Sequence, residues 1–290
     1  MFKGIYVAII TPFKNGRIDE EGLRKNLKFL IQSGVAGIVP CGTTGETPTL
    51  STDEWLRVIK ITVEEVKGKA QVIAGAGTNS TEKTIRNLEK LADLGIDAAL
   101  IVTPYYNKPT QEGLIQHYLE LGKVGVPIVA YNVPGRTGCN LLPETIQRIA
   151  AKSEALVAVK EAGGNLDAVS RLITLVGDRI DILSGDDSLT LPMLAVGAKG
   201  VISVVANIFP AELVQMIDCF FKGEIETARE IHLRLFPLTK LLFIETNPIP
   251  IKKAMELIGM AAGKPRLPLV EMSEANTRLL EEELKRLGRL

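Results

Sequence analysis

Short apolar stretches alternate with amphipathic stretches over residues 1–223 of the chain. The apolar stretches consist mainly of Val, Ile, Ala and Leu without polar alternation, which is typical of strands in a parallel sheet covered on both faces. They predict eight strands, at residues 4–10, 37–41, 71–74, 98–102, 127–131, 157–160, 180–184 and 200–205.

A helix is predicted after each of these strands, and some helix starts carry clear signals. Asp19 is the expected cap of the first helix, and Ser51 with Glu54 three residues later forms a capping box. Eight strand–helix repeats are the count for a closed (β/α)8 barrel, the TIM-barrel fold. An open doubly wound sheet is the alternative, but it usually has fewer strands, and no GxGxxG fingerprint opens the first turn here.

The strand pattern stops at residue 224. Helical patterns follow at residues 224–243, 249–258 and 273–287, with prolines between them. We therefore expect two parts, a (β/α)8 barrel with the catalytic site at 1–223 and a C-terminal helical subdomain at 224–290. No low-complexity linker separates them, so the helices are expected to pack on the barrel.

Composition and charge argue against two classes of function, nucleic-acid binding and membrane insertion. Lys and Arg number 34 and so do Asp and Glu, so the net charge is zero and nucleic-acid binding is disfavoured. No apolar run reaches membrane-spanning length, and the first one is too short for a signal peptide, so we expect a cytoplasmic protein without a membrane partner.

Cysteine and histidine usage argues against a metal centre. The three cysteines, Cys41, Cys139 and Cys219, show no CxxC spacing, which favours a reducing compartment and no zinc site. His117 and His232 both lie in helical patterns and are expected to be packing or surface residues. So few histidines disfavour a Ser-His-Asp triad and a histidine-ligated metal.

The sixth predicted strand ends in Lys160. A buried ammonium group is costly, so such a lysine either reaches solvent or becomes a neutral amine, which is a nucleophile toward carbonyl groups. Strand alternation puts Val157 and Val159 on one face and Ala158 and Lys160 on the other. The bulky face suits the outer helices, so we expect Lys160 to point into the barrel; a solvent-facing lysine is the alternative.

Other polar residues follow the C-terminal ends of strands, where barrel active sites lie. The Gly-Thr-Thr-Gly turn at residues 42–45 offers N–H groups and two hydroxyls to a small carboxylate, or is simply a tight turn. Tyr131 can relay protons or merely pack. Arg136, in a predicted loop, offers a planar fork to a second carboxylate, or is only solvated. With Lys160, these residues predict a Schiff-base site for a keto acid.

Four motifs carry a family resemblance over essentially the whole chain: GTTGE at 42–46, YNVP at 131–134, VKEA at 159–162 and GVIS at 200–203. They resemble the class I pyruvate-dependent aldolases of the dihydrodipicolinate synthase and N-acetylneuraminate lyase group. Arg136, in Tyr-Asn-Val-Pro-Gly-Arg-Thr, is similar to the synthase branch, which condenses pyruvate with L-aspartate 4-semialdehyde to 4-hydroxy-tetrahydrodipicolinate in lysine (diaminopimelate) biosynthesis.

The resemblance implies a role for each matching residue. Lys160 would form an imine with pyruvate. Thr43, Tyr131 and Tyr106 would form a proton relay, with Tyr106 supplied by a neighbouring subunit. Arg136 would bind the carboxylate of the semialdehyde.

The resemblance further implies that Thr44, with Thr43, binds the pyruvate carboxylate, and that Gly185 and the backbone of Ile202 line the pocket. It implies homotetramers built from tight dimers, and no metal or organic cofactor. A disulfide between Cys139 and its copy across an interface is a separate hypothesis.

One region departs from lysine-inhibited members of the family. Thr52, Trp55 and Lys83 stand where those relatives often carry histidine and glutamate, although Asn79 and Tyr106 match. The cation of Lys83 should repel the ammonium group of a lysine ligand, so we expect weak or no lysine feedback.

Two rival functions stay open at this point. An aldolase for a 2-keto-3-deoxy sugar acid would use the same chemistry, but Ser, Thr or Asn would suit its substrate better than Arg136. An inactive binding or regulatory barrel is the alternative of another class. It is disfavoured because Thr43, Tyr106, Tyr131, Arg136 and Lys160 are all present.

Overall fold

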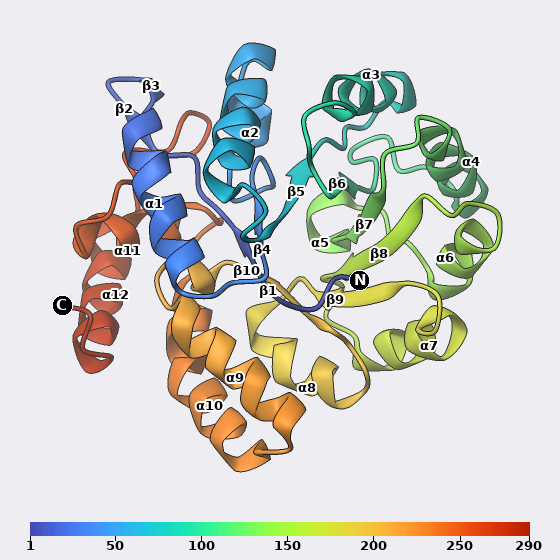
Figure 1. The fold of residues 1–290 in the computed structure, drawn as a ribbon. Helices are drawn as coiled ribbons and strands as arrows, with labels where there is room; N and C mark the ends of the chain where they lie inside the picture. Colours follow the sequence, from blue (N-terminus) through green and yellow to red (C-terminus); the bar gives the residue numbers. More distant parts are fainter. The chain divides into compact units, whose positions relative to one another are not determined.

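Eight parallel strands close into a barrel in the computed structural model, which describes all 290 residues (Figure 1). Around the barrel the strands follow the order β1-β10-β9-β8-β7-β6-β5-β4. The predicted (β/α)8 fold is therefore confirmed, and each of the eight strands lies within two residues of its expected ends. Their bounds are β1 (Gly4–Ala8), β4 (Gly37–Val39), β5 (Gln71–Gly75), β6 (Ala98–Val102), β7 (Ile128–Asn132), β8 (Leu156–Glu161), β9 (Asp181–Ser184) and β10 (Gly200–Ser203).

The contacts within the chain define two compact units. The first comprises Met1–Gly4 and Val72–Ile202, and the second comprises Ile5–Gln71 and Ser203–Leu290. The second unit thus combines the N-terminal elements with the C-terminal helices. The division of the chain at residue 223 stays a prediction.

The first unit contains the strand pairs on which Lys160 depends. β7 pairs with β8 in parallel, with Tyr131 opposite Lys160 and Asn132 opposite Glu161. On the other side β8 pairs with β9, with Lys160 opposite Leu183. The helices of this unit are α3 (Thr81–Leu91), α4 (Gln111–Gly122), α5 (Pro134–Thr137), α6 (Pro143–Ala150), α7 (Leu166–Val176) and α8 (Thr190–Ala195).

The second unit begins with β1 and a small hairpin that the sequence analysis did not predict. β2 (Phe13–Lys14) and β3 (Arg17–Ile18) are antiparallel, joined by Asn15 and Gly16. Both turn residues have positive φ, 53° and 75°, which matches the backbone of a two-residue hairpin turn. The Asn-Gly pair in the sequence could therefore have been used to predict this hairpin.

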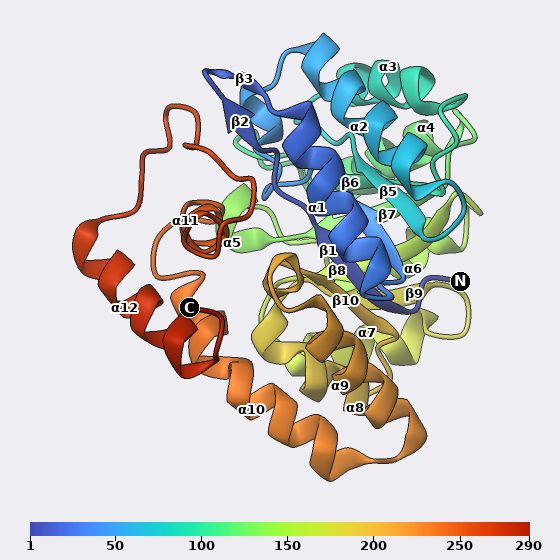
Figure 2. The same ribbon diagram turned by 60° about the vertical axis from the view of Figure 1, so that its left-hand side comes forward.

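Helices make up most of the rest of the second unit. They are α1 (Glu20–Gln32), α2 (Thr52–Val66), α9 (Pro210–Lys222), α10 (Ile225–Leu241), α11 (Ile249–Leu257) and α12 (Glu274–Arg286). α9 and α10 lie side by side, and α12 packs against α10 and α11 (Figure 2). The three C-terminal helical patterns are thus confirmed as α10, α11 and α12.

The predicted helix caps are confirmed. The carboxylate of Asp19 accepts a hydrogen bond from the N–H of Gly22, at 2.9 Å. Ser51 and Glu54 form the reciprocal capping box, and Ser80 caps α3. These contacts satisfy N–H groups that a helix start leaves without partners inside the helix. None of the helices combines the length and the apolar surface needed to cross a membrane.

Candidate active site

Lys160 lies near the C-terminal end of β8 and is buried, with 6% of its surface exposed. Its Nζ lies 4.2 Å from the centre of the Tyr131 ring. The two residues are direct partners in the β7–β8 pairing, so their side chains project from the sheet on the same side. Tyr131 is also 6% exposed. The structure therefore brings together an amine and a phenol that the sequence analysis singled out.

Gly185, directly after β9, leaves room for the lysine. A Cβ atom at this position would lie 3.0 Å from Cε of Lys160 and 2.7 Å from Cβ of Ala162. The Gly185 N–H donates to the carbonyl oxygen of Glu161 at 2.7 Å, which holds the glycine close to β8. Ile202 is buried on β10.

Arg136 was expected in a loop, and this expectation is wrong: it lies in the short helix α5. Pro134 starts this helix, where its missing N–H costs nothing, and Gly138 ends it with a left-handed φ of 67°. Arg136 is exposed.

Tyr106 lies in the segment after β6. Its side chain is 89% exposed, and its backbone has a left-handed φ of 74°, which is uncommon for an aromatic residue. Its N–H donates to the carbonyl oxygen of Thr137 at 3.4 Å. The Tyr106 segment is therefore bonded to the helix that carries Arg136.

A buried acid–amide pair on the same two strands was missed by the sequence analysis. Asn132 Nδ2 donates to Glu161 Oε2 at 2.9 Å and to Asn140 Oδ1 at 2.8 Å, and its Oδ1 accepts from the Leu141 N–H. The N–H of Gly163 donates to the other oxygen of Glu161. Burial raises the pKa of Glu161, although these two donors act in the opposite direction.

Thr43 and Thr44 belong to the second unit, in the turn after β4. The turn is closed by bonds from the Gly45 N–H to the Gly42 carbonyl and from the Glu46 N–H to the Thr43 carbonyl, each 3.1 Å. Thr44 is 3% exposed, and its Oγ1 accepts a hydrogen bond from Nδ2 of Asn247 at 3.0 Å.

Glu46, at the end of this turn, forms a buried ion pair. Its Oε1 lies 2.6 Å from Nζ of Lys252, and the two side chains are 0% and 2% exposed. Its Oε2 accepts from the backbone N–H of Arg266 at 2.8 Å. Desolvation lowers the pKa of Lys252, although Glu46 acts against that change.

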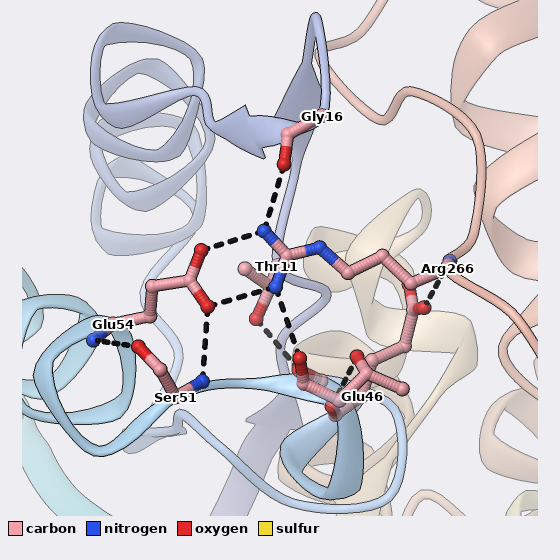
Figure 3. A network of polar contacts seen from close by, with 8 residues as sticks. Thr11, Gly16, Glu46, Ser51, Glu54 and Arg266 are labelled. Carbon is pink, nitrogen blue, oxygen red and sulfur yellow. Dashed lines mark hydrogen bonds and ion pairs between the residues drawn. The ribbon is translucent and has the colours of Figure 1, made fainter.

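Arg266 extends this network to α2 (Figure 3). Its guanidinium group binds both carboxylate oxygens of Glu54, at 2.6 and 2.8 Å, and also donates to the carbonyl oxygens of Gly16 and Thr49. The hydrogen bonds from Arg266 lower the pKa of Glu54 to about 2. The sequence pattern indicated Glu54 only as part of a capping box.

The histidines and cysteines, for which no catalytic role was predicted, are packed within the fold. His117 is buried in α4, where its Nδ1 lies 2.9 Å from Oγ1 of Thr81, and desolvation lowers its pKa to about 4. His232 packs near the Phe236 ring, so both histidines are packing residues as predicted. The three cysteines are free and buried. No cluster of three or more His, Cys, Asp or Glu side chains could hold a metal ion.

A closed parallel barrel with a buried lysine against a tyrosine defines the class: a (β/α)8-barrel lyase of the Schiff-base type. Residues 1–287 match the model of the dihydrodipicolinate synthetase family. The chain belongs to this family, and the resemblance seen in the four motifs is confirmed.

Named relatives cover the whole chain. The 4-hydroxy-tetrahydrodipicolinate synthase of Methanocaldococcus jannaschii is 55% identical over 289 residues, 99% of either chain. The dihydrodipicolinate synthase of Thermotoga maritima is 46% identical in sequence, with a TM-score of 0.98 and full coverage of both chains. A Cyanidioschyzon merolae relative, solved with lysine bound, is 38% identical with a TM-score of 0.97, covering 100% of this chain and 99% of its own. These relatives do not favour the sugar-acid aldolase or the inactive barrel.

Proposed function

We propose that this chain condenses pyruvate with L-aspartate 4-semialdehyde to form 4-hydroxy-tetrahydrodipicolinate in lysine (diaminopimelate) biosynthesis. The observation that carries the proposal is the position of Lys160, buried at the end of β8 with its amine 4.2 Å from the Tyr131 ring centre. A buried strand end holds the nucleophilic amine in one place, and the Tyr131 ring packs directly against it.

The reaction then follows from the chemistry of these groups. Unprotonated Nζ of Lys160 attacks the keto carbon of pyruvate, and loss of water leaves an imine. Removal of a proton from the pyruvate methyl group turns the imine into an enamine, whose carbon attacks the aldehyde carbon of the second substrate. The amino group of that substrate then displaces Lys160 from the imine carbon, which closes the ring and frees the enzyme.

The other site residues have roles in this scheme that are part of the proposal. Tyr131 relays protons together with Thr43 and with Tyr106 of a neighbouring subunit. Thr44 binds the pyruvate carboxylate, and Arg136 binds the carboxylate of the semialdehyde through two parallel hydrogen bonds.

Gly185 and the backbone of Ile202 line the pocket. No metal or organic cofactor takes part, because the imine itself withdraws electrons from the reacting carbon.

The proposed assembly is a cytoplasmic homotetramer built from dimers. The contact between two subunits in this assembly is supported by the Tyr106 side chain, which is 89% exposed and held in a left-handed backbone conformation. Such a conformation costs about 1–3 kcal/mol and persists only where the surroundings impose it. An aromatic side chain presented in this way suits insertion into a partner subunit. Weak or absent lysine feedback also stays a proposal, resting on Lys83.

Borohydride trapping tests the central step. The protein is incubated with pyruvate and sodium borohydride and then digested for mass spectrometry. We expect a reduced pyruvyl adduct on Lys160, no adduct in Lys160→Ala, and an unchanged yield in Lys152→Ala, a surface control. An adduct elsewhere, or none, would remove the proposal. A coupled assay with aspartate semialdehyde then identifies the second substrate.

A further inference from the structure

The hydroxyl of Thr44 is held from one side by a buried amide. Thr44 and Asn247 are 3% and 5% exposed, and Nδ2 of Asn247 donates to Oγ1 of Thr44 at 3.0 Å. A hydroxyl has one hydrogen to donate and two lone pairs that accept. Because one lone pair faces the Asn247 amide, the hydroxyl hydrogen must point away from it.

We propose that Asn247 is a positioning residue that orients the Thr44 hydroxyl as a hydrogen-bond donor to the carboxylate of the keto acid. This inference rests on the proposed function, in which Thr44 binds that carboxylate. An anion requires donors, and a freely rotating hydroxyl offers its lone pairs as readily as its hydrogen. If the Thr44 hydroxyl is already oriented before the substrate binds, no free energy of binding is lost in reorienting it.

The buried ion pair maintains the distance between the two residues. Glu46 follows Thr44 by two residues, and Lys252 lies in α11, which begins two residues after Asn247. The 2.6 Å contact between Glu46 and Lys252 therefore joins the two segments a second time, close to the Thr44–Asn247 bond.

Additional contacts fix the same two segments. Nζ of Lys252 lies 4.3 Å from the centre of the Phe13 ring, and the Arg266 N–H binds the second oxygen of Glu46. With several independent contacts, neither segment can shift without breaking a buried bond. The direction of the Thr44 hydroxyl is thus set by the fold of the second unit.

The decisive experiment measures pyruvate binding alone. The rate of borohydride trapping on Lys160 is recorded against pyruvate concentration for the wild type, Asn247→Leu, Thr44→Val and the double variant. Leucine has the same branched shape as asparagine, although it is larger, and it neither donates nor accepts hydrogen bonds. We expect Asn247→Leu to raise the pyruvate concentration for half-maximal trapping about tenfold, the effect of one hydrogen bond, while the saturating rate changes less.

The double variant separates positioning from a general effect on structure. If Asn247 acts through the Thr44 hydroxyl, Asn247→Leu has no further effect once Thr44→Val has removed that hydroxyl. An equal fold-change in both backgrounds, or no change in the single variant, would overturn the proposal. So would an unaltered half-saturation in Thr44→Val.

A second variant covers the case in which leucine prevents folding. Asn247→Asp keeps the shape but accepts a hydrogen bond, so it turns the Thr44 hydrogen away from the substrate. We expect a larger loss of pyruvate affinity than with leucine, and an affinity like that of the wild type would contradict the proposal. If wild-type protein is not trapped at Lys160, the proposed function fails. If wild-type protein is trapped but the Asn247 variants need no more pyruvate for half-maximal trapping than the wild type, this inference alone fails.

Discussion

The end of β8 and the turn after β4 are held by different kinds of contact. Lys160 is placed by backbone pairing with β7 and β9, its neighbours in the barrel order. The turn that carries Thr44 is held by residues 203 and more positions further along the chain: the Asn247 side chain binds Thr44, and the Lys252 side chain and the Arg266 backbone N–H bind Glu46. The main-chain hydrogen bonds of the ladder do not pass through any single side chain, whereas the turn depends on a few polar groups. A single substitution of a polar side chain should therefore lower the free energy of unfolding more at the turn after β4 than at the end of β8.

The largest effect is expected from Glu46→Gln. The substitution leaves the buried Lys252 ammonium without a carboxylate, and removing one partner of a buried pair typically costs about 3–5 kcal/mol of the free energy of unfolding. Denaturant titration at pH 7 measures this loss. Replacing both residues, with Glu46→Gln and Lys252→Met together, should restore part of it, because no unpaired charge then remains. A single variant as stable as the wild type would show that the turn does not depend on this pair.

A smaller loss is expected from Asn132→Ala, beside Lys160. It removes the donor to Glu161 and the acceptor of the Leu141 N–H, which leaves buried polar groups without these partners. We expect about 2–3 kcal/mol of destabilisation by denaturant titration. Borohydride trapping of the folded variant should still occur at Lys160, because backbone pairing places the lysine. Loss of trapping in a folded variant would contradict the comparison.

The smallest effect, and one that depends on pH, is expected from Arg266→Ala. The pKa of Glu54 is about 2 in the folded protein, below its ordinary value of 4.5, so the Arg266 contact stabilises the fold above about pH 5. This contribution disappears as the pH falls from about 5 toward 2, where Glu54 becomes protonated. The variant should therefore be less stable than the wild type by about 1–2 kcal/mol at pH 7, after allowance for partial solvent exposure, and the difference should shrink at pH 3.

Arg148→Ala is the matched control for that measurement. Arg148 binds Glu112 at 2.8 Å, but both side chains are about half exposed. Exposed pairs contribute little, so this variant should match the wild type at both pH values. A difference between Arg266→Ala and the wild type that stays constant from pH 7 to pH 3 would show that lost packing, rather than the ion pair, is responsible.

The same difference between local patterns and distant contacts explains which structural features could be predicted from the sequence. The eight strands were predictable because apolar residues dominate each short run, and the alternation of Ala158 and Lys160 with two valines predicts that Lys160 faces the barrel interior. The helix around Arg136 was missed although Pro134 and Gly138 are ordinary start and stop signals, because the segment has no room for a periodic pattern. Asn132 and Glu161 occupy paired strand ends, so their contact could have been found from the register.

The contacts of Thr44 could not have been predicted in this way. Asn247, Lys252 and Arg266 lie in a segment whose visible signals are its prolines and its helical period. Periodicity reports which face of an element is buried, but it does not say which distant side chain will meet that face. The pairing of Glu46 with Lys252, 206 residues apart, arises only when the second unit is folded.

The second unit is built from two separate stretches of the chain, Ile5–Gln71 and Ser203–Leu290, and this has a consequence for synthesis on the ribosome. Residues 72–202 are contiguous and can begin to fold as they emerge. The turn after β4 is synthesised before residues 72–202, whereas Asn247, Lys252 and Arg266 are synthesised after them. A nascent chain that has reached residue 202 therefore contains Lys160 but still lacks the groups that hold the turn, so the turn can make its final contacts only after residue 266 has emerged from the ribosome.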